Sequence, residues 1–168
     1  MIIGKGDIAS AITDKENVTF FASGISNSAC EDENQFARER DLLLAQKKNM
    51  HLVYFSSLGI YYNPNTMYML HKKRMEALVK ENFMCYTIFR IGNILWGNNQ
   101  TTLINALKNK IRNKENFVVK DDHRYLLTKT GFMTALKKVK IGNKEIIPLT
   151  GRMLKVSEIV DEIIEGKL

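Results

Sequence analysis

The chain has few cysteines that could form disulfides, few prolines that interrupt helices, and no apolar run long enough to span a membrane. Its 168 residues include two prolines, one tryptophan and two cysteines, Cys30 and Cys85. A framework of several disulfides is thereby excluded, and we expect plain thiols in a reducing, cytoplasmic compartment. No apolar run approaches the roughly 20 residues that span a bilayer, so no membrane partner is expected. The three histidines stand at no ligand spacing from cysteines or carboxylates, which predicts no metal site.

The remaining composition is that of an ordinary globular protein of one domain. Hydrophobic residues make up 45% and charged residues 26%, which is enough apolar surface for a core without a metal or disulfide. The net charge of +7 permits an anionic partner. Basic residues concentrate in the second half, but few aromatic residues lie among them. Solvated helix faces are therefore favoured over a nucleic-acid surface.

Short apolar runs alternate along the chain with stretches of helical period, a pattern that predicts an α/β fold. Clusters of β-branched and aromatic residues predict strands at 1–4, 17–22, 51–55 and 83–91. Apolar residues at helical spacing predict helices at 7–14, 33–48, 66–81 and 101–113. Asp32 is the expected N-cap of the second helix.

The last third of the chain has a different hydrophobic pattern from the first two thirds. Short strands are predicted at 117–119 and 146–147, around a helix at 128–139. An amphipathic helix follows from about residue 154 and ends at Gly166. We expect a nucleotide-binding core at 1–116 and a small C-terminal α/β appendage on the substrate side at 117–168, in one compact unit.

The first motif with chemical meaning is a G-x-G-x-x-A turn after the first strand, formed by Gly4, Gly6 and Ala9. In this context one glycine permits a tight turn, the next lets a diphosphate approach the main chain, and the alanine allows close helix packing. Asp7 suits the start of a helix but would repel a phosphate placed near it. A plain glycine turn is the alternative interpretation.

The second motif is Tyr68-x-x-x-Lys72, whose two side chains share one helix face. A lysine in this position lowers the pKa of a phenol and makes it usable for acid–base chemistry. A serine at the end of the preceding strand, Ser56 or Ser57, would hold the reacting oxygen. The alternative without a function is an exposed tyrosine beside a solvated run of basic residues, Lys72, Lys73 and Arg74.

The motifs occur in an order that resembles the short-chain dehydrogenase/reductase superfamily, in its extended branch of NAD-dependent nucleotide-sugar epimerases and dehydratases. The glycine turn comes first, and a strand ending in Ala22, Ser23 and Gly24 follows. Then come the Ser-Ser strand end with a tyrosine at 61, the Tyr68 to Lys72 motif, and an R-x-x-N-x-x-G segment from 90 to 97. The resemblance covers nearly the whole chain.

The resemblance implies a catalytic triad of Ser57, Tyr68 and Lys72. In that family the tyrosine exchanges a proton with the substrate, the lysine tunes it and binds the nicotinamide ribose, and the serine bonds the reacting oxygen. NAD or NADP is the implied cofactor, with a nucleotide-linked sugar or similar carbonyl or alcohol as substrate. Ser56 is an expected substrate contact, and Trp96 is expected either to line the substrate pocket or to pack in the core. The implied cofactor contacts are Gly4, Gly6, Asp7, Ile8, Ala9, Ala22, Ser23, Gly24, Arg90 and Asn93.

The chain departs from this family in length. Only a short helix fits between Gly6 and Val18, so the second and third strands of the doubly wound order 3-2-1-4-5-6 are missing. We expect a minimal Rossmann-like parallel sheet of order 1-4-5-6 flanked by helices. The missing half normally supplies the acidic residue that binds the adenosine ribose, so the adenosine half-site is expected to be absent.

Two further hypotheses stay open beside an NAD(P)-dependent oxidoreductase or epimerase. One is a degenerate Rossmann module that acts as a binding or regulatory protein. The other is an enzyme that uses the same tyrosine and lysine on another nucleotide-like ligand without hydride transfer. We also expect a homo-oligomer, formed through the helices at 33–48 and 66–81 and covering the open edge of the first strand.

Overall fold

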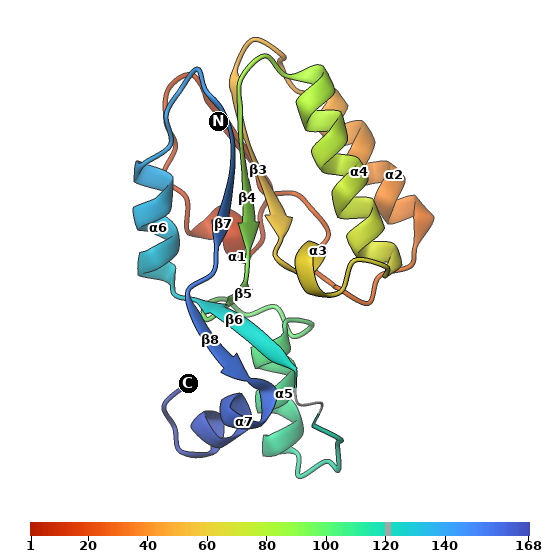
Figure 1. Ribbon diagram of the computed structural model, residues 1–168, viewed down its shortest axis with the longest axis vertical. Helices are drawn as coiled ribbons and strands as arrows, with labels where there is room; N and C mark the ends of the chain where they lie inside the picture. Colours follow the sequence, from red (N-terminus) through yellow and green to blue (C-terminus); the bar gives the residue numbers. More distant parts are fainter. Residues whose placement is uncertain (120–121) are drawn as a thin grey trace.

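The computed structural model describes residues 1–119 and 122–168, and its main feature is a five-stranded parallel sheet (Figure 1). The strand order is β1-β2-β3-β4-β7. The strands are β1 (Ile2–Ile3), β2 (Val18–Phe21), β3 (His51–Ser57), β4 (Tyr86–Ile91) and β7 (Lys144–Leu149). The first four strands therefore lie in the sheet in the order in which they occur in the sequence.

Helices cover both faces of this sheet. On one face lie α2 (Glu33–Leu44) and α4 (Met67–Asn82), side by side, and on the other lie α1 (Asp7–Ser10) and α6 (Lys129–Lys137) (Figure 1). A short helix, α3 (Gly59–Tyr62), follows β3 directly. Both faces of the sheet are buried beneath helices, which explains why the central strands are nearly continuously apolar.

The period of two along each strand divides the core. Phe20, Val53 and Phe89 pack toward α6, where they meet Phe132. Their neighbours along the strands point to the opposite face and pack against α2 and α4, as Tyr54 does. The register pairs Tyr54 with Ile88, which keeps the two sets separate throughout the sheet.

A second, three-stranded sheet of order β5-β6-β8 lies beyond the carboxyl ends of the main strands (Figure 1). Its strands are β5 (Asn93–Ile94), β6 (His123–Leu127) and β8 (Arg152–Lys155), and α5 (Leu103–Arg112) and α7 (Val156–Ile164) cover it. Glycines stand at two crossovers between the sheets. A Cβ atom on Gly92 would lie 2.5 Å from the carbonyl oxygen of Tyr125, and one on Gly151, where φ is +65°, would lie 2.1 Å from that of Leu126.

The fold class and the order of the first four strands are confirmed, but several boundaries are wrong. Residues 117–119 form no strand; the strand of that region is β6, at His123–Leu127. The helix expected from residue 154 begins at Val156, because β8 occupies the residues before it. The helices expected at 7–14 and 33–48 end earlier, at Ser10 and Leu44.

The expected division after residue 116 does not follow the boundary between the two sheets. The segment from residue 117 onward returns to the main sheet through α6 and β7 before it completes the small sheet with β8. Arg90 of β4 pairs with Pro148 of β7. The strand β7 therefore belongs to the main sheet and not to a separate appendage. None of the helices described is both long and apolar enough to cross a membrane.

Candidate functional site

The carboxyl ends of β2, β3 and β4 border a cavity of about 390 Å³, here called the strand-end cavity. This is the edge at which open parallel sheets bind ligands. It is bordered by the β2–α2 loop (residues 22–32), the ends of the strands and the start of α5. Its polar lining consists of Ser26, Asn27, Ser28, Ser56, Ser57, Tyr62, Tyr68, Lys72, Asn93, Thr101 and Thr102.

A second cavity of about 410 Å³, here called the turn cavity, adjoins the first along the glycine turn. Ile8, Ala22, Gly24 and Thr102 are among the residues that line both cavities. The turn cavity differs in charge, because Lys5 and Arg38 line it together with Asp7.

The structure divides the predicted site residues into three groups. The strand-end cavity is lined by Ile8, Ala22, Gly24, Ser56, Ser57, Tyr68, Lys72 and Asn93. The turn cavity is lined by Gly6, Asp7, Ile8, Ala22, Ser23 and Gly24. Neither cavity is lined by Gly4, Ala9, Arg90 or Trp96. The three predicted triad residues therefore meet at one cavity, whereas part of the predicted cofactor set does not.

The glycine turn is built for close contact between main-chain segments. Gly4 has φ of +130°, and a Cβ atom there would lie 2.3 Å from the carbonyl oxygen of Ala22. Gly4 thus lets the end of β1 lie against the end of β2. Gly6 differs, because a Cβ atom on it would meet no heavy atom within 4 Å, which leaves open space beside the turn cavity.

Asp7 ties the turn to the segment after β5. Its carboxylate accepts hydrogen bonds from the main-chain nitrogens of Asn98 and Asn99, both at 3.1 Å. Its carbonyl oxygen accepts one from Nε1 of Trp96 at 3.0 Å. A Cβ atom on Gly97 would lie 2.0 Å from Cγ of Asp7, so this segment packs directly on the aspartate. Asp7 has a structural role here, and its charge stands beside the turn.

The predicted triad has a different arrangement from the one that the family resemblance implies. Tyr68 is 8% exposed and donates a hydrogen bond at 3.1 Å to the carbonyl oxygen of Ile25. Oγ of Ser57 accepts one from the main-chain nitrogen of Gly59 at 3.1 Å. The ammonium group of Lys72 lies 5.5 Å from the centroid of the Tyr68 ring. Tyr68 and Lys72 thus share a helix face as predicted, but each already has a partner.

The partner of Lys72 is Glu39 of α2, a residue that no motif in the sequence marks. Glu39 is fully buried, and its Oε1 accepts hydrogen bonds from Nζ of Lys72 at 2.9 Å and from the hydroxyl of Tyr54 at 2.8 Å. Its Oε2 accepts one from the main-chain nitrogen of Ile25 at 2.9 Å and lies 3.1 Å from Nε2 of His71. One carboxylate therefore joins α2, β3, α4 and the β2–α2 loop.

This buried ion pair sets the titration of the site. Burial raises the pKa of the Glu39 carboxyl, but the charge of Lys72 and the hydrogen bonds outweigh it and lower that pKa well below the ordinary 4.5. Burial lowers the pKa of Lys72, yet Glu39 raises it above the ordinary 10.5. Burial also raises the pKa of Tyr68 above 10.0, and Lys72 offsets only part of this rise. Tyr68 is therefore a protonated hydroxyl at neutral pH.

A second buried carboxylate binds two more predicted residues. Glu76 of α4 accepts a hydrogen bond from Oγ of Ser56 at 2.7 Å and a two-pronged pair from Arg90, at 2.9 and 2.6 Å. The guanidinium of Arg90 also lies 4.8 Å from the centroid of the Tyr61 ring. Arg90 thus joins β4 to α4 and α3, and its polar atoms face Glu76.

Trp96 and Asn93 complete the predicted set. The Trp96 ring packs against Phe132, with centroids 5.2 Å apart, in the core on the α6 side of the sheet. This is the packing role that the sequence left open for it. Asn93 lines the strand-end cavity, and its Nδ2 lies 3.4 Å from the carbonyl oxygen of Tyr125. Among the described residues, no group of three histidines, cysteines or carboxylates could hold a metal ion.

No family model and no curated protein matches this chain. Solved structures do match it. The Bordetella bronchiseptica enzyme WbmH in complex with NAD⁺ superposes with a TM-score of 0.73 at 14% identity, over 89% of this chain and 58% of that one. The fold is Rossmann-like.

Two further structures agree with this fold. A dTDP-glucose 4,6-dehydratase from Bacillus anthracis in complex with NAD has a TM-score of 0.67 at 16% identity, over 90% of this chain and 58% of that one. A UDP-glucose 4-epimerase from Thermotoga maritima with UDP-glucose has a TM-score of 0.66 at 17% identity, over 90% and 61%. This chain thus spans less than two thirds of the length of each of these three structures.

Proposed function

We propose that this protein binds a nucleotide-linked sugar, or a similar compact ligand with a sugar part and a phosphate part, without hydride transfer. The sugar part occupies the strand-end cavity and the phosphate part occupies the turn cavity. The observation that carries this proposal is the difference in lining between the two adjoining cavities.

The strand-end cavity offers hydroxyl and amide groups from ten polar residues, and Lys72 is the one charged residue in its lining. Such groups donate and accept hydrogen bonds with the hydroxyl groups of a sugar. Its one charge is balanced by Glu39 behind it. Ser57 and Tyr68 stand at the wall of this cavity and would bind a ligand oxygen.

The turn cavity suits an anion. Lys5 and Arg38 line it, and Arg38 is held in place by hydrogen bonds to the carbonyl oxygen and hydroxyl of Ser23, at 3.3 and 2.9 Å. Thr102, the N-cap residue of α5, lines it as well, so the unpaired amide groups of that ten-residue helix begin beside it. Open space at Gly6 leaves room for the ligand.

Two observations argue against a whole NAD or NADP in this place. Lys72, which would hold the nicotinamide ribose, is held by Glu39. In the described part of the chain β1 is an edge strand of the main sheet, so no further strand is present to hold an adenosine ribose. The residues present do not fit the whole dinucleotide.

An NAD(P)-dependent oxidoreductase or epimerase is the second candidate. It is favoured by the meeting of Ser57, Tyr68 and Lys72 at one cavity and by the fold that this chain shares with NAD-bound enzymes. In this candidate the hydroxyl of Tyr68 exchanges Ile25 for a substrate oxygen. Replacing Tyr68 with phenylalanine would then abolish turnover and leave ligand binding intact. Turnover would be measured by the absorbance of the nicotinamide.

Calorimetric titration with UDP-glucose, UDP, NAD and NADP tests the proposal. We expect UDP-glucose and UDP to bind and the two dinucleotides to give no heat of binding. Arg38→Met should weaken UDP and UDP-glucose alike, by about tenfold for one lost charged hydrogen bond. Tyr68→Phe should weaken UDP-glucose and not UDP. Arg40→Met, on the exposed face of the same helix, is the matched control.

The outcomes separate the candidates. Binding of NAD with no binding of UDP-glucose would overturn the proposal in favour of the second candidate. Equal losses for UDP and UDP-glucose in Tyr68→Phe would place the sugar outside the strand-end cavity. Association through α2 and α4 stays a prediction, and light scattering that finds a monomer would contradict it.

A further inference from the structure

Lys72 is a buried charge at the wall of a cavity that is otherwise lined by uncharged groups. It is 2% exposed and is the one charged residue that lines the described strand-end cavity. A lone ammonium group in that place would draw an anion into the cavity. Its charge is met by Oε1 of Glu39 at 2.9 Å, and the hydroxyl of Tyr54 lies 3.2 Å from the same nitrogen.

Glu39 itself lies outside the cavity wall. It is fully buried and lines neither cavity, so it acts on a ligand through the residues that it holds. It binds Lys72 with one oxygen and the main chain of Ile25 with the other. The carbonyl oxygen of Ile25 in turn accepts the hydroxyl of Tyr68. The carboxylate thus fixes both the charge and the shape of this wall.

We propose that Glu39 is a positioning residue that determines specificity: by balancing the charge of Lys72, it makes the strand-end cavity accept uncharged hydroxyl and carbonyl groups and exclude carboxylates and phosphates. The identity of the ligand rests on the proposed function, whereas the charge balance does not. Glu39 also holds the β2–α2 loop against Tyr68 through its hydrogen bond to the main chain of Ile25.

A simple structural role for Glu39 makes different predictions. If the carboxylate only ties elements together, its loss weakens every ligand alike. If it balances charge, its loss leaves Lys72 unopposed, and the cavity then favours anions. The titratable groups that act on the pKa of Tyr68 include Lys72, Glu39, Tyr62 and Cys30, which come from three helices and the loop, and Tyr54 also interacts with Tyr68. Those packed on Glu39 are Tyr54, His71 and Lys72.

The first test needs no ligand. The ring carbon resonance of Tyr68, assigned with Tyr68→Phe, is followed against pH in protein labelled with ¹³C-tyrosine. In Glu39→Gln we expect the pKa of Tyr68 to fall by about one unit, because the negative charge of Glu39 that raises this pKa is removed. Asp41→Asn removes an exposed carboxylate from the same helix and should leave that pKa in place. No fall in Glu39→Gln would overturn the proposal.

The second test compares UDP-glucose with UDP-glucuronic acid, which replaces an uncharged group of the sugar with a carboxylate. We expect the protein to prefer UDP-glucose. Glu39→Gln should shift the ratio of the two affinities toward the glucuronic acid by about tenfold. Lys72→Met, which leaves Glu39 alone, should shift it the other way. An unchanged ratio with both affinities reduced would assign Glu39 a structural role only.

The double variant Glu39→Gln with Lys72→Met guards against loss of folding. It removes both charges at once and so leaves no unpaired ion in the core. We expect it to fold and to keep the ratio of the unmodified protein. A ratio like that of Glu39→Gln would overturn the charge balance. If neither nucleotide sugar binds any variant, the proposed function fails, and the Tyr68 titration still decides the role of Glu39.

Discussion

A side-chain carbon on Gly24 would lie 2.9 Å from Nζ of Lys72 and 3.0 Å from Oε1 of Glu39. The β2–α2 loop therefore runs across the buried ion pair at a distance that only a glycine permits. Glycine serves here for the lack of a side chain instead of for its backbone freedom. The loop, the lysine and the carboxylate form one packed unit at the edge of the strand-end cavity.

Gly24→Ala should destabilise the protein by about 1–3 kcal/mol, the range for an extra methyl group in a packed site. Lys72 cannot move away freely, because that would break its contacts with Glu39 and Tyr54. The free energy of unfolding in urea measures the effect. Gly6→Ala is the control, since its new methyl group would meet no atom within 4 Å. Equal stability of the two variants would contradict this reading of the loop.

Lys72→Met should be costlier, by about 3–5 kcal/mol, because it leaves Glu39 buried without its cation. The double variant with Glu39→Gln should recover part of this loss. Lys73→Met is the matched control: it removes the adjacent, exposed lysine, which makes one long contact with a carbonyl oxygen (3.4 Å). Its effect should stay within about 0.5 kcal/mol. Urea unfolding of the three variants checks the order.

The ion pair also predicts how stability depends on pH. Glu39 has a folded pKa below the ordinary 4.5, so its contribution is complete above pH 4.5 and is lost as the pH falls toward the folded value. Lys72 has a folded pKa above 10.5, so its contribution is complete below pH 10.5 and is lost as the pH rises through the folded value.

We therefore expect the unfolding free energy to fall on acidification below pH 4.5 by more than it does in the double variant Glu39→Gln with Lys72→Met. Unfolding in urea at a series of pH values measures both curves. Parallel curves would show that other carboxyl groups cause the acid sensitivity and that the pair contributes none of it.

Asp7→Asn should separate stability from binding. The amide keeps one acceptor for Asn98 and Asn99, where the carboxylate has two, so the variant should lose about 1 kcal/mol of stability. It also removes a negative charge from the turn cavity, so the affinity for UDP should rise. Calorimetry and urea unfolding give the two quantities. A fall in UDP affinity would contradict a phosphate in the turn cavity.

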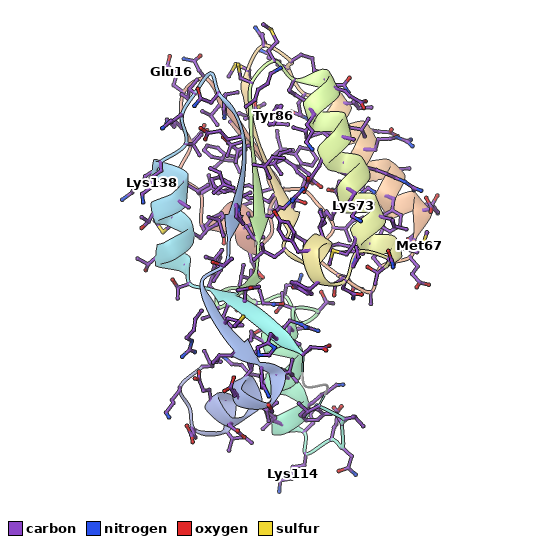
Figure 2. All side chains as sticks on the ribbon, viewed as in Figure 1. Glu16, Met67, Lys73, Tyr86, Lys114 and Lys138 are labelled. Carbon is purple, nitrogen blue, oxygen red and sulfur yellow. The ribbon has the colours of Figure 1, made fainter. Side chains whose placement is uncertain are left out.

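Glu16→Gln serves as the control for that variant. It also removes one negative charge from the first twenty residues, but Glu16 lies at the end of the sheet away from the small sheet, as Figure 2 shows. The affinity for UDP should therefore stay as it is in the unmodified protein. Equal gains in the two variants would point to net charge instead of a local contact.

The sequence predicts the main sheet well because its strands are apolar on both faces. The run that contains Phe20 and Phe21 sends one ring to each side of the sheet, and such a run has few other interpretations. The small sheet was harder to predict. Its β6 mixes charged and apolar residues, while the apolar Val118 nearby is 91% exposed and belongs to no strand. A local apolar run gives no information about whether a partner covers it.

Sequence motifs predict only part of the candidate site. Tyr68 and Lys72 share a helix face because four residues separate them, and this holds for any helix. Glu39 could not be found in this way, since a glutamate between two arginines on an amphipathic helix reads as a solvated residue. Its burial depends on Tyr54 and Lys72, which come from distant parts of the chain. A signal that was available is the lysine itself, because a buried lysine requires an anion.

The place of β7 has a consequence for how the protein is made. Lys144 of β7 pairs with Tyr86 of β4, so the segment that forms β5, α5, β6 and α6 lies between the two partners in the sequence. During synthesis, the first four strands are complete while β4 still has an open edge next to the apolar residues Ile88 and Phe89. That edge is a surface for pairing with another chain until β7 arrives. Because non-local strand pairs form slowly in general, we expect the pairing of β7 with β4 to come late in folding.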